Sequence, residues 1–323
     1  METYLYRNKL TKAIMFVMLL LLTSCLEDPI KTQIEDNFLS SIVVLDNNYF
    51  TCSSEGNIYK SENAVDWQLI PTTNTNLLLS LDSKQEIGIC SGENGTVLVS
   101  TNSGDIWSAK ATGVSSFLKN IRIINDSIFI ASGESGTVII STDTGESWGR
   151  IETEFTSTVN DMNFYNGVVY FGLRSSTEPN ELLYKFDVLT DSLEVIDLEF
   201  DELITDISII NDEIYVSDFS GCYKLINQND IYSKELIYET LGDFFIIEDV
   251  VEMNGELNLI GNLGFNLGKL IIDAEGSKTE VVFEESVYFS SAISHDNKIV
   301  ACGGDELEIL IYDDSNSEIV KIK

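Results

Sequence analysis

The stretch that decides the fold is GENGTVLVSTNSGDIW, which runs from Gly92 to Trp107. A second copy, GESGTVIISTDTGESW, runs from Gly133 to Trp148. A looser third copy, SSEGNIYKSENAVDW, runs from Ser53 to Trp67, so the three copies begin at nearly even spacing. Similarity at a fixed interval of about 20–50 residues is typical of proteins built from repeated structural units.

The same interval recurs along the whole chain as a series of expected hairpin turns. At each turn an apolar stretch ends in Asn or Asp and a β-branched or aromatic stretch follows: Asp46-Asn47-Asn48, Asp82-Ser83-Lys84, Asn125-Asp126-Ser127, Asn166-Gly167, Asn211-Asp212-Glu213, Asn254-Gly255 and Asp296-Asn297. Successive turns recur every ~40 residues, which is within the range of repeat proteins. Asn and Asp tolerate the left-handed backbone angles of tight hairpins, and Asn-Gly is a strong hairpin signal.

Seven hairpins at this interval, each with room for two further strands, predict an all-β fold. We expect a seven-bladed β-propeller of four-stranded blades over residues 38–323. The expected blades are 38–74, 75–113, 114–156, 157–199, 200–240, 241–285 and 286–323. Within the third blade, the expected strands are Ser116–Ile124, Ser127–Ser132, Thr137–Ser141 and Trp148–Glu152. Two packed β-sandwiches could also use many short strands, but they would not require a constant interval.

Two stretches fit the pattern S-x-[DN]-x-G-x-x-W, which is the Asp-box or BNR repeat. The matching residues are Ser100, Asn102, Gly104 and Trp107 in one stretch and Ser141, Asp143, Gly145 and Trp148 in the other. We expect a tight turn between the third and fourth strands of a blade, in which the Asn or Asp oxygen accepts backbone N–H groups and glycine takes a positive φ. The indole is large enough to wedge between adjacent blades. These residues are therefore expected to have a structural role.

The longer phrase G-x-x-G-T-V-x-x-S-T-[DN]-x-G-x-x-W resembles the Ycf48-like group of BNR propellers over about residues 38–156. The resemblance implies an assembly factor or binding scaffold rather than an enzyme. Photosynthetic members of that group carry an arginine-rich binding face. Here the arginines that follow Ser24 are Arg122, Arg150 and Arg174, so the partner of those proteins does not carry over.

The N-terminus predicts export and lipidation. Basic residues precede the uncharged run from Ala13 to Leu22, which is too short to span a bilayer but fits a signal peptide at residues 1–24. Leu22-Thr23-Ser24-Cys25 resembles the bacterial lipobox, so Cys25 is the expected lipid anchor and residues 25–37 a tether. We therefore expect a lipoprotein of the bacterial outer membrane. Glu27-Asp28 resembles a Bacteroidetes surface-export signal, which favours exposure at the cell surface.

Charge excludes one class of partner. After residue 25 the chain has 16 basic and 52 acidic side chains. Nucleic-acid binding needs clustered Lys and Arg, which this chain lacks. Because 44% of the residues are hydrophobic, the chain can still bury a large core and is not expected to be disordered.

No catalytic or metal-binding pattern stands out, so we predict no enzyme activity and no cofactor. A sialidase needs three arginines converging on a carboxylate and a Tyr nucleophile, and the three arginines here fall in two adjacent expected blades. His295, the only histidine, is expected in a solvated turn. Cys and His do not occur at zinc-ligand spacings. Other hydrolases or lyases stay open, since many carboxylates make any acidic pair uninformative.

The four cysteines after Cys25 are expected to be buried and unbridged. Cys52, Cys90 and Cys302 fall at similar positions in their blades, and equivalent points on neighbouring blades are expected to lie beyond the ~7 Å Cα limit for a disulfide. Cys222 falls in a third strand.

The expected partner surface is acidic. Glu55, Glu93 and Glu134 follow the second strand of the first three blades, with Asp218 and Asp305 at nearby positions of later blades. If they share one face, they form an acidic arc suited to a cationic protein segment. The alternative is a glycan-binding or carbohydrate-active propeller, which predicts exposed aromatic side chains at one mouth of the channel.

Overall fold

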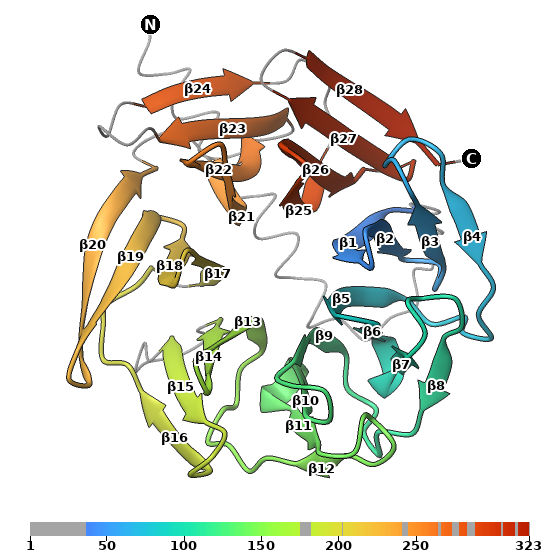
Figure 1. Ribbon diagram of the computed structural model, residues 1–323. Helices are drawn as coiled ribbons and strands as arrows, with labels where there is room; N and C mark the ends of the chain where they lie inside the picture. The colour runs from blue at the N-terminus through green and yellow to red at the C-terminus, as the bar shows by residue number, and fades with distance from the viewer. Residues whose placement is uncertain are drawn as a thin grey trace, which may run out of the picture. The chain divides into compact units, whose positions relative to one another are not determined.

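The computed structural model describes residues 37–174, 182–201, 203–240, 245–263, 266–272, 278–282, 288–304, 306–313 and 316–322. The predicted signal peptide, Cys25 and all but the last residue of the predicted tether lie outside these ranges, as does Asp305. The described residues form seven four-stranded antiparallel sheets, each made of four consecutive strands. The sheets are arranged around a common axis as the blades of a propeller (Figure 1).

We number the blades in chain order. Blade 1 comprises β1 (Leu39–Leu45), β2 (Asn48–Ser53), β3 (Ile58–Ser61) and β4 (Gln68–Ile70). Blade 2 comprises β5 (Leu78–Lys84), β6 (Ile87–Gly92), β7 (Val97–Ser100) and β8 (Ser108–Lys110). Blade 3 comprises β9 (Leu118–Ile123), β10 (Phe129–Gly133), β11 (Val138–Ser141) and β12 (Gly149–Arg150). Blade 4 comprises β13 (Val159–Tyr165), β14 (Val168–Leu173), β15 (Leu183–Asp187) and β16 (Ser192–Val195). Short 3-10 turns η1 (Glu93–Gly95) and η2 (Glu134–Gly136) follow β6 and β10.

Blades 5 to 7 continue the same order. Their strands are β17 (Ile204–Ile210), β18 (Glu213–Asp218), β19 (Gly221–Gln228), β20 (Ile231–Glu239); β21 (Phe245–Met253), β22 (Glu256–Leu263), β23 (Asn266–Ile272), β24 (Lys278–Val282); and β25 (Phe289–His295), β26 (Lys298–Gly303), β27 (Glu308–Asp313), β28 (Asn316–Lys321). The first strand of each blade packs beside those of its two neighbours, and β25 packs against β1, so the ring is closed.

The core lies between the blades. The second strand of a blade is covered on both faces, as in β2, where every residue from Tyr49 to Ser53 is buried. Apolar clusters therefore join each blade to the next, for example Leu45 and Phe50 of blade 1 with Leu81 of blade 2. Burial of this kind stabilises the fold by ~25 cal/mol per Å² of apolar surface removed from water.

The hairpin turns follow from the chemistry of their residues. Both central residues take a positive φ in the turns Asp46-Asn47, Asn166-Gly167, Asn211-Asp212, Asn254-Gly255 and Asp296-Asn297. These angles match the right-handed twist of the flanking strands. The turn expected at Asp82-Ser83-Lys84 is wrong, because those residues belong to β5 and the chain reverses at Gln85 and Glu86.

The expected blades are less uniform than the sequence suggested. In blade 3 the last strand was expected over Trp148–Glu152 but spans Gly149–Arg150 alone. The reason is that Trp148 belongs to the preceding turn, where its indole N–H donates to the carbonyl of Gly145 at 3.1 Å. The outer strands vary from two residues in β12 to nine in β20.

The four cysteines are buried and unbridged, as predicted. One pair nevertheless lies closer than the sequence reasoning implied. Cys52 in blade 1 and Cys90 in blade 2 lie in the same buried cluster, and burial, followed by the proximity of Cys90, raises the pKa of the Cys52 thiol. Similar positions on neighbouring blades can therefore bring side chains together even where each strand belongs to a different sheet.

Candidate functional site

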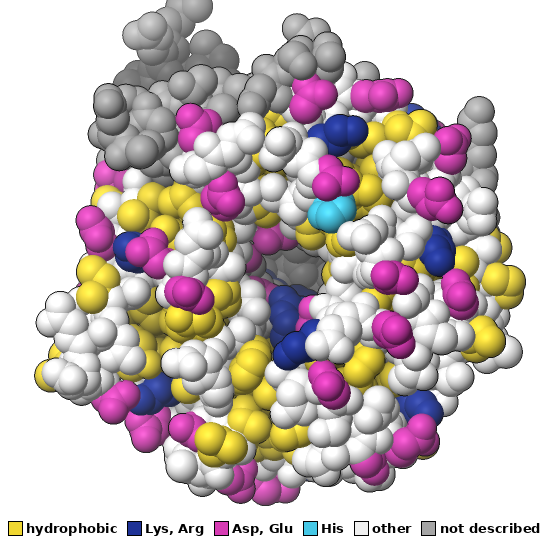
Figure 2. Space-filling model, viewed as in Figure 1, with side chains coloured by type: hydrophobic (Ala, Val, Ile, Leu, Met, Phe, Trp, Pro, Cys, Tyr) yellow, Lys and Arg dark blue, Asp and Glu magenta, His cyan; other side chains and the backbone are white. Residues whose placement is uncertain are grey.

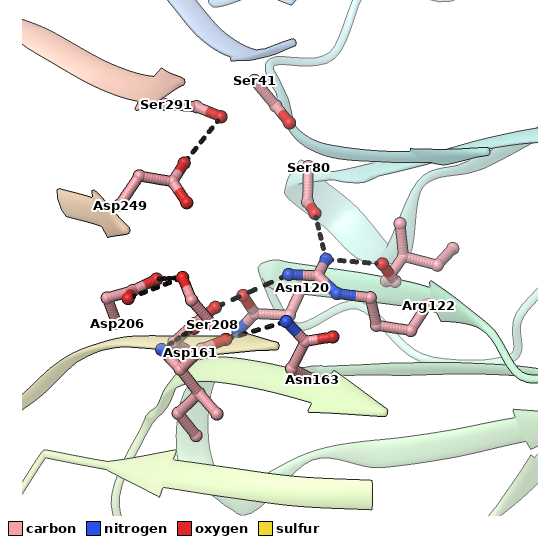
Figure 3. Close-up of polar contacts among 12 residues, drawn as sticks. Ser41, Ser80, Asn120, Arg122, Asp161, Asn163, Asp206, Ser208, Asp249 and Ser291 are labelled. Carbon is pink, nitrogen blue, oxygen red and sulfur yellow. Dashed lines mark hydrogen bonds and ion pairs between the residues drawn. The ribbon is translucent and has the colours of Figure 1, made fainter. Parts of the chain in front are cut away.

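The central channel is lined by one polar residue from each blade at the same register position. In every blade the first strand carries a bulge, and the ring residue is the one directly after it. In six blades this residue pairs with the penultimate residue of the second strand, whereas in blade 6 Asp249 pairs with Ile260, two residues further from the end of β22. The seven residues, which we call the channel ring, are Ser41, Ser80, Asn120, Asp161, Asp206, Asp249 and Ser291. Figure 3 shows them around the central space, with serines on one side and carboxylates on the other.

Several channel side chains join adjacent blades. The Asp161 carboxylate accepts the backbone N–H of Ile207 in the next blade at 2.7 Å, and the Asp249 carboxylate accepts that of Ala292 at 2.9 Å. The Ser41 hydroxyl accepts the N–H of Leu81 in the same way, at 3.1 Å. An inner strand has no partner strand on its channel side, so its N–H groups there need other hydrogen-bond acceptors, and these side chains supply them. The ring residues thus have a structural role first.

Three neighbouring carboxylates give the channel an unusual electrostatic character. Asp206 is 5% exposed, and its carboxylate accepts the Ser208 hydroxyl at 2.8 Å. Burial and then the nearby charges of Asp249 and Asp161 raise its pKa well above the ordinary range. Burial likewise raises the pKa of Asp249 to about 7. Asp206 and Asp249 therefore resist ionisation more than exposed carboxylates do.

Arg122 is the basic counterpart of these carboxylates. Its guanidinium donates to the carbonyl of Ile121 at 2.9 Å and to the Ser80 hydroxyl at 3.4 Å, and it lies 3.8 Å from the Asp161 carboxylate. Figure 2 shows Lys and Arg side chains on the wall of the central opening. Arg150 is in the outer strand β12, and Arg174 is exposed at the end of β14. The three arginines therefore come from inner, outer and edge positions and do not form a sialidase-like cluster.

Glu55, Glu93 and Glu134 lie on one end of the propeller. Because the strands alternate in direction, the loops between second and third strands share this end with the connections between blades. Backbone hydrogen bonds join the two sets, as from Glu93 to Leu77 at 2.9 Å and from Glu134 to Phe117 at 3.0 Å. We call this end the 2–3 face and the opposite end, where the other hairpins lie, the 1–2 face.

Further exposed carboxylates lie in the blade connections of the 2–3 face. They are Glu152, Glu154, Asp197, Glu199 and Asp201. Asp218 was expected in this acidic surface, but the expectation is wrong, because the residue is only 1% exposed. Its carboxylate accepts backbone N–H groups of Asp201, Ser220 and Gly221. Its role is to hold a loop.

The two S-x-[DN]-x-G-x-x-W stretches form turns on the 1–2 face. Asn102 accepts the Ser100 hydroxyl at 2.9 Å and the N–H of Ile106 at 3.1 Å, while Gly104 has a φ of 79°. In the other stretch, Asp143 accepts the Ser141 hydroxyl and the Ser147 N–H at 2.8 Å, and the hydrogen bonds with Ser147 lower its pKa to about 2. Gly145 has a φ of 82°.

The tryptophans of these turns fill the space between blades. Trp107 of blade 2 is 7% exposed and packs among Leu45 and Phe50 of blade 1. Trp148 of blade 3 packs in the same manner beside Val99 of blade 2. A Cβ at Gly104 would lie 2.3 Å from the Phe50 ring, so glycine is required for this close approach.

His295 is not the solvated turn residue that the sequence suggested. It ends β25, packs edge-on against the Tyr49 ring at 5.5 Å, and its Nε2 lies 3.6 Å from the Asp296 carboxylate. Among the residues that the structure describes, no group of three His, Cys, Asp or Glu side chains could hold a metal ion. Within the same residues, no helix is long and apolar enough to cross a membrane.

One cleft was missed by the sequence reasoning. It lies between blades 4 and 5, has a volume of about 600 Å³ and is lined by Tyr165, Tyr170, Tyr232, Lys185 and Lys224, among others. Blade 5 has no Asp-box tryptophan between its third and fourth strands, but neither have blades 4, 6 and 7, so no sequence signal singles out this cleft.

Comparison with known proteins supports the fold. No family model matches the sequence, and no curated protein matches it. Among solved structures, YCF48 bound to D1 peptide is similar with a TM-score of 0.68 at 12% identity, over 86% of this chain and 94% of that one. The WD40 β-propeller domain of Doa1 has a TM-score of 0.65 at 14% identity, over 86% and 94%.

A glycosidase propeller is also similar. The GH74 enzyme of Niastella koreensis has a TM-score of 0.64 at 13% identity, over 85% of this chain and 52% of that one. At these identities the likeness concerns the fold alone. The chain is an all-β propeller of four-stranded blades, similar in fold to YCF48 and to WD40 propellers.

Proposed function

We propose that this chain is a non-catalytic binding scaffold that holds a cationic protein segment on its 2–3 face. The observation that carries the proposal is the run of exposed carboxylates there, with Glu55 and Glu134 exposed in their loops and Glu93 half-buried between them. Adjacent blades repeat the same acidic loop, so the charges form an arc rather than scattered points. Such an arc steers and orients a basic partner, and its attraction is weakened by salt.

The channel supports a scaffold rather than a catalyst. Two of its three ring carboxylates accept backbone N–H groups of the next blade, and Arg122 is engaged by a backbone carbonyl. These hydrogen bonds to the backbone fix the carboxylates and the guanidinium group in place. A general acid or base must instead reach the proton of a substrate.

The glycan alternative, in the form expected from the sequence, has less support. It requires exposed aromatic side chains gathered at one mouth of the channel. Among the described residues the exposed large aromatic side chains are Phe219 and Tyr288, which belong to blade 5 and to the connection before β25. They do not come from adjacent blades, so no aromatic platform is formed by these residues.

We also propose that the scaffold acts outside the cytoplasm, at the outer membrane, held by a lipid on Cys25. The support is the sequence pattern at residues 1–25. A membrane-tethered propeller would meet partners in or near that membrane. Metabolic labelling with a palmitate analogue should label the wild-type protein, and Cys25→Ala should abolish the label.

The binding proposal is tested with a defined probe, an arginine-rich dodecapeptide, titrated against the chain from residue 26 onward. The triple variant Glu55→Lys, Glu93→Lys and Glu134→Lys should bind about 30-fold more weakly, since each rim charge contributes ~0.5–1 kcal/mol. The matched control reverses three exposed carboxylates of the same blades on the 1–2 face: Glu62, Glu86 and Asp126. Equal weakening in both triple variants would show a general charge effect and refute the assignment of the face.

A further inference from the structure

The cleft between blades 4 and 5 lies where another blade pair holds a tryptophan. Between blades 1 and 2, the Trp107 indole fills a space bounded by Leu45, Phe50 and Gly88. Leu45 pairs with the first residue of β2, and Phe50 is the third residue of that strand. The strand register thus gives a means of finding the equivalent place in any other pair of blades.

The equivalent residues in blades 4 and 5 all line the cleft. Tyr165 pairs with the first residue of β14, as Leu45 does in β2, and Tyr170 is the third residue of β14, as Phe50 is in β2. Ile214 is the second residue of β18, as Gly88 is in β6. Tyr165, Tyr170 and Ile214 are lining residues of the cleft. The cleft therefore occupies the volume that the indole fills elsewhere.

Blade 5 replaces the Asp-box by a two-residue hairpin. Asn229 and Asp230 both take a positive φ, and β20 begins at once with Ile231. No tryptophan occurs in this part of the sequence, and the cleft lies in the corresponding space. An empty space between packed sheets costs stability unless it is wet or occupied, and this one is lined by polar groups that suit either.

The lining groups form ion pairs, one of which joins the two blades. The Lys185 ammonium lies 3.1 Å from the Glu194 carboxylate and 3.3 Å from that of Asp230, which belongs to the other blade. It also lies 5.4 Å from the centre of the Tyr232 ring. Lys224 pairs with Glu213. Each pair presents hydrogen-bond donors and acceptors side by side, and the tyrosines add ring faces and phenol groups.

This lining excludes most classes of ligand. A cation would need the place over Tyr232 and between two carboxylates that Lys185 already holds. An anion would meet the carboxylates of Asp187 and Asp212, which also line the cleft. A purely apolar ligand would leave the ion pairs without water. A neutral molecule with adjacent hydroxyl groups fits, because one hydroxyl can donate to a carboxylate while the next accepts from the ammonium group.

We propose that the cleft between blades 4 and 5 binds a neutral oligosaccharide, with a sugar ring against Tyr165 and adjacent hydroxyls bonded by the Lys185 and Lys224 ion pairs. The site is on the 1–2 face side and does not depend on the acidic 2–3 face. It is a binding site alone, and no bond is made or broken in it.

The test is a binding screen of the full mature chain against neutral probes. These are cellohexaose, xylohexaose, maltohexaose and mannohexaose, with trigalacturonic acid as an anionic probe and spermine as a cationic one. Binding of at least one neutral probe, measured by titration calorimetry, is expected. Binding of spermine or of trigalacturonic acid alone, or binding of no probe, would overturn the proposal.

Variants locate the site. Tyr165→Ala should weaken binding of the neutral probe by about tenfold, the loss expected for one aromatic contact. Ser192→Trp, which fills the cleft while leaving every phenol in place, should abolish it. Tyr288→Ala is the matched control, since it removes an exposed tyrosine outside the cleft. Unchanged affinity in Ser192→Trp, with unfolding curves like those of wild type, would show that the sugar binds elsewhere.

Discussion

The channel carboxylates predict that Asp249→Asn stabilises the protein, and that the gain depends on pH. In the folded chain, burial raises the pKa of Asp249 from 3.8 to about 7. The charges that face it are those of Asp161, Glu248 and Asp206, which oppose its ionisation, and of Arg122, which favours it. Asparagine removes the charge but keeps an oxygen that can accept the N–H of Ala292.

The sign and size follow from proton linkage. A carboxyl whose pKa is higher in the folded state stabilises that state fully below pH ~4, and this stabilisation is lost as the pH rises from ~4 to ~7. At about 1.4 kcal/mol per pKa unit, the loss has an upper limit of about 4 kcal/mol. Water in the channel and the coupling to Asp206 reduce it, so we expect Asp249→Asn to gain about 1–3 kcal/mol at pH 8.

The assay is urea unfolding of wild type and variant at pH 4.5, 6 and 8, with the free energy of unfolding compared at each pH. The gain should be smallest at pH 4.5, at about a quarter of its full size, and largest at pH 8. Asp126→Asn, which alters an exposed carboxylate, serves as control and should show little difference at any pH. A variant that is destabilised at pH 8, or a gain of equal size at all three pH values, would refute the reasoning.

Three further perturbations test the packing. Trp107→Ala should lower the free energy of unfolding by ~3–5 kcal/mol, because the buried Trp107 indole fills the space between blades 1 and 2. Trp148→Ala should lower it by less, since Trp148 is more exposed, and chemical denaturation of both variants measures the difference. Gly133→Ala should destabilise the fold more than Gly113→Ala, because a Cβ would lie 1.9 Å from the Phe117 carbonyl oxygen in the first case, whereas in the second it would meet no atom and the cost is that of the positive φ of 76° alone. The melting temperatures of the two variants test this order. The four buried thiols should resist a thiol reagent in the native chain and all react after denaturation, and fewer than four reactive thiols in the unreduced, denatured chain would contradict the unbridged state.

Local turn chemistry made the hairpins predictable. Pairs such as Asn166-Gly167 and Asp296-Asn297 take positive φ because their own side chains allow it, and no distant contact is needed. The failure at Asp82 shows the limit of such reasoning. Asp82 is a good turn former, but its carboxylate accepts the N–H of Ile123 in the next blade at 2.7 Å, so tertiary contact holds it in a strand.

The channel ring and the cleft could not be read from the sequence in the same way. Which residue of an inner strand faces the axis depends on the bulge, and one residue more or less would place a different side chain there. Asp161 and Asp206 therefore looked like any other acidic residues. The cleft beside Tyr165 is formed by side chains of two blades, and its position can be found only once the register of their strands is known.

In the proposed function, the partner binds the 2–3 face and not the 1–2 face. Photo-crosslinking in cells of the source organism tests it most directly, with a benzophenone side chain placed at residue 93 on the 2–3 face or at residue 86 on the 1–2 face of the same blade. We expect a discrete crosslink from residue 93 to a protein with a basic segment, weakened by added salt, and none from residue 86. A crosslink from residue 86 alone, or from both positions with equal yield, would contradict it.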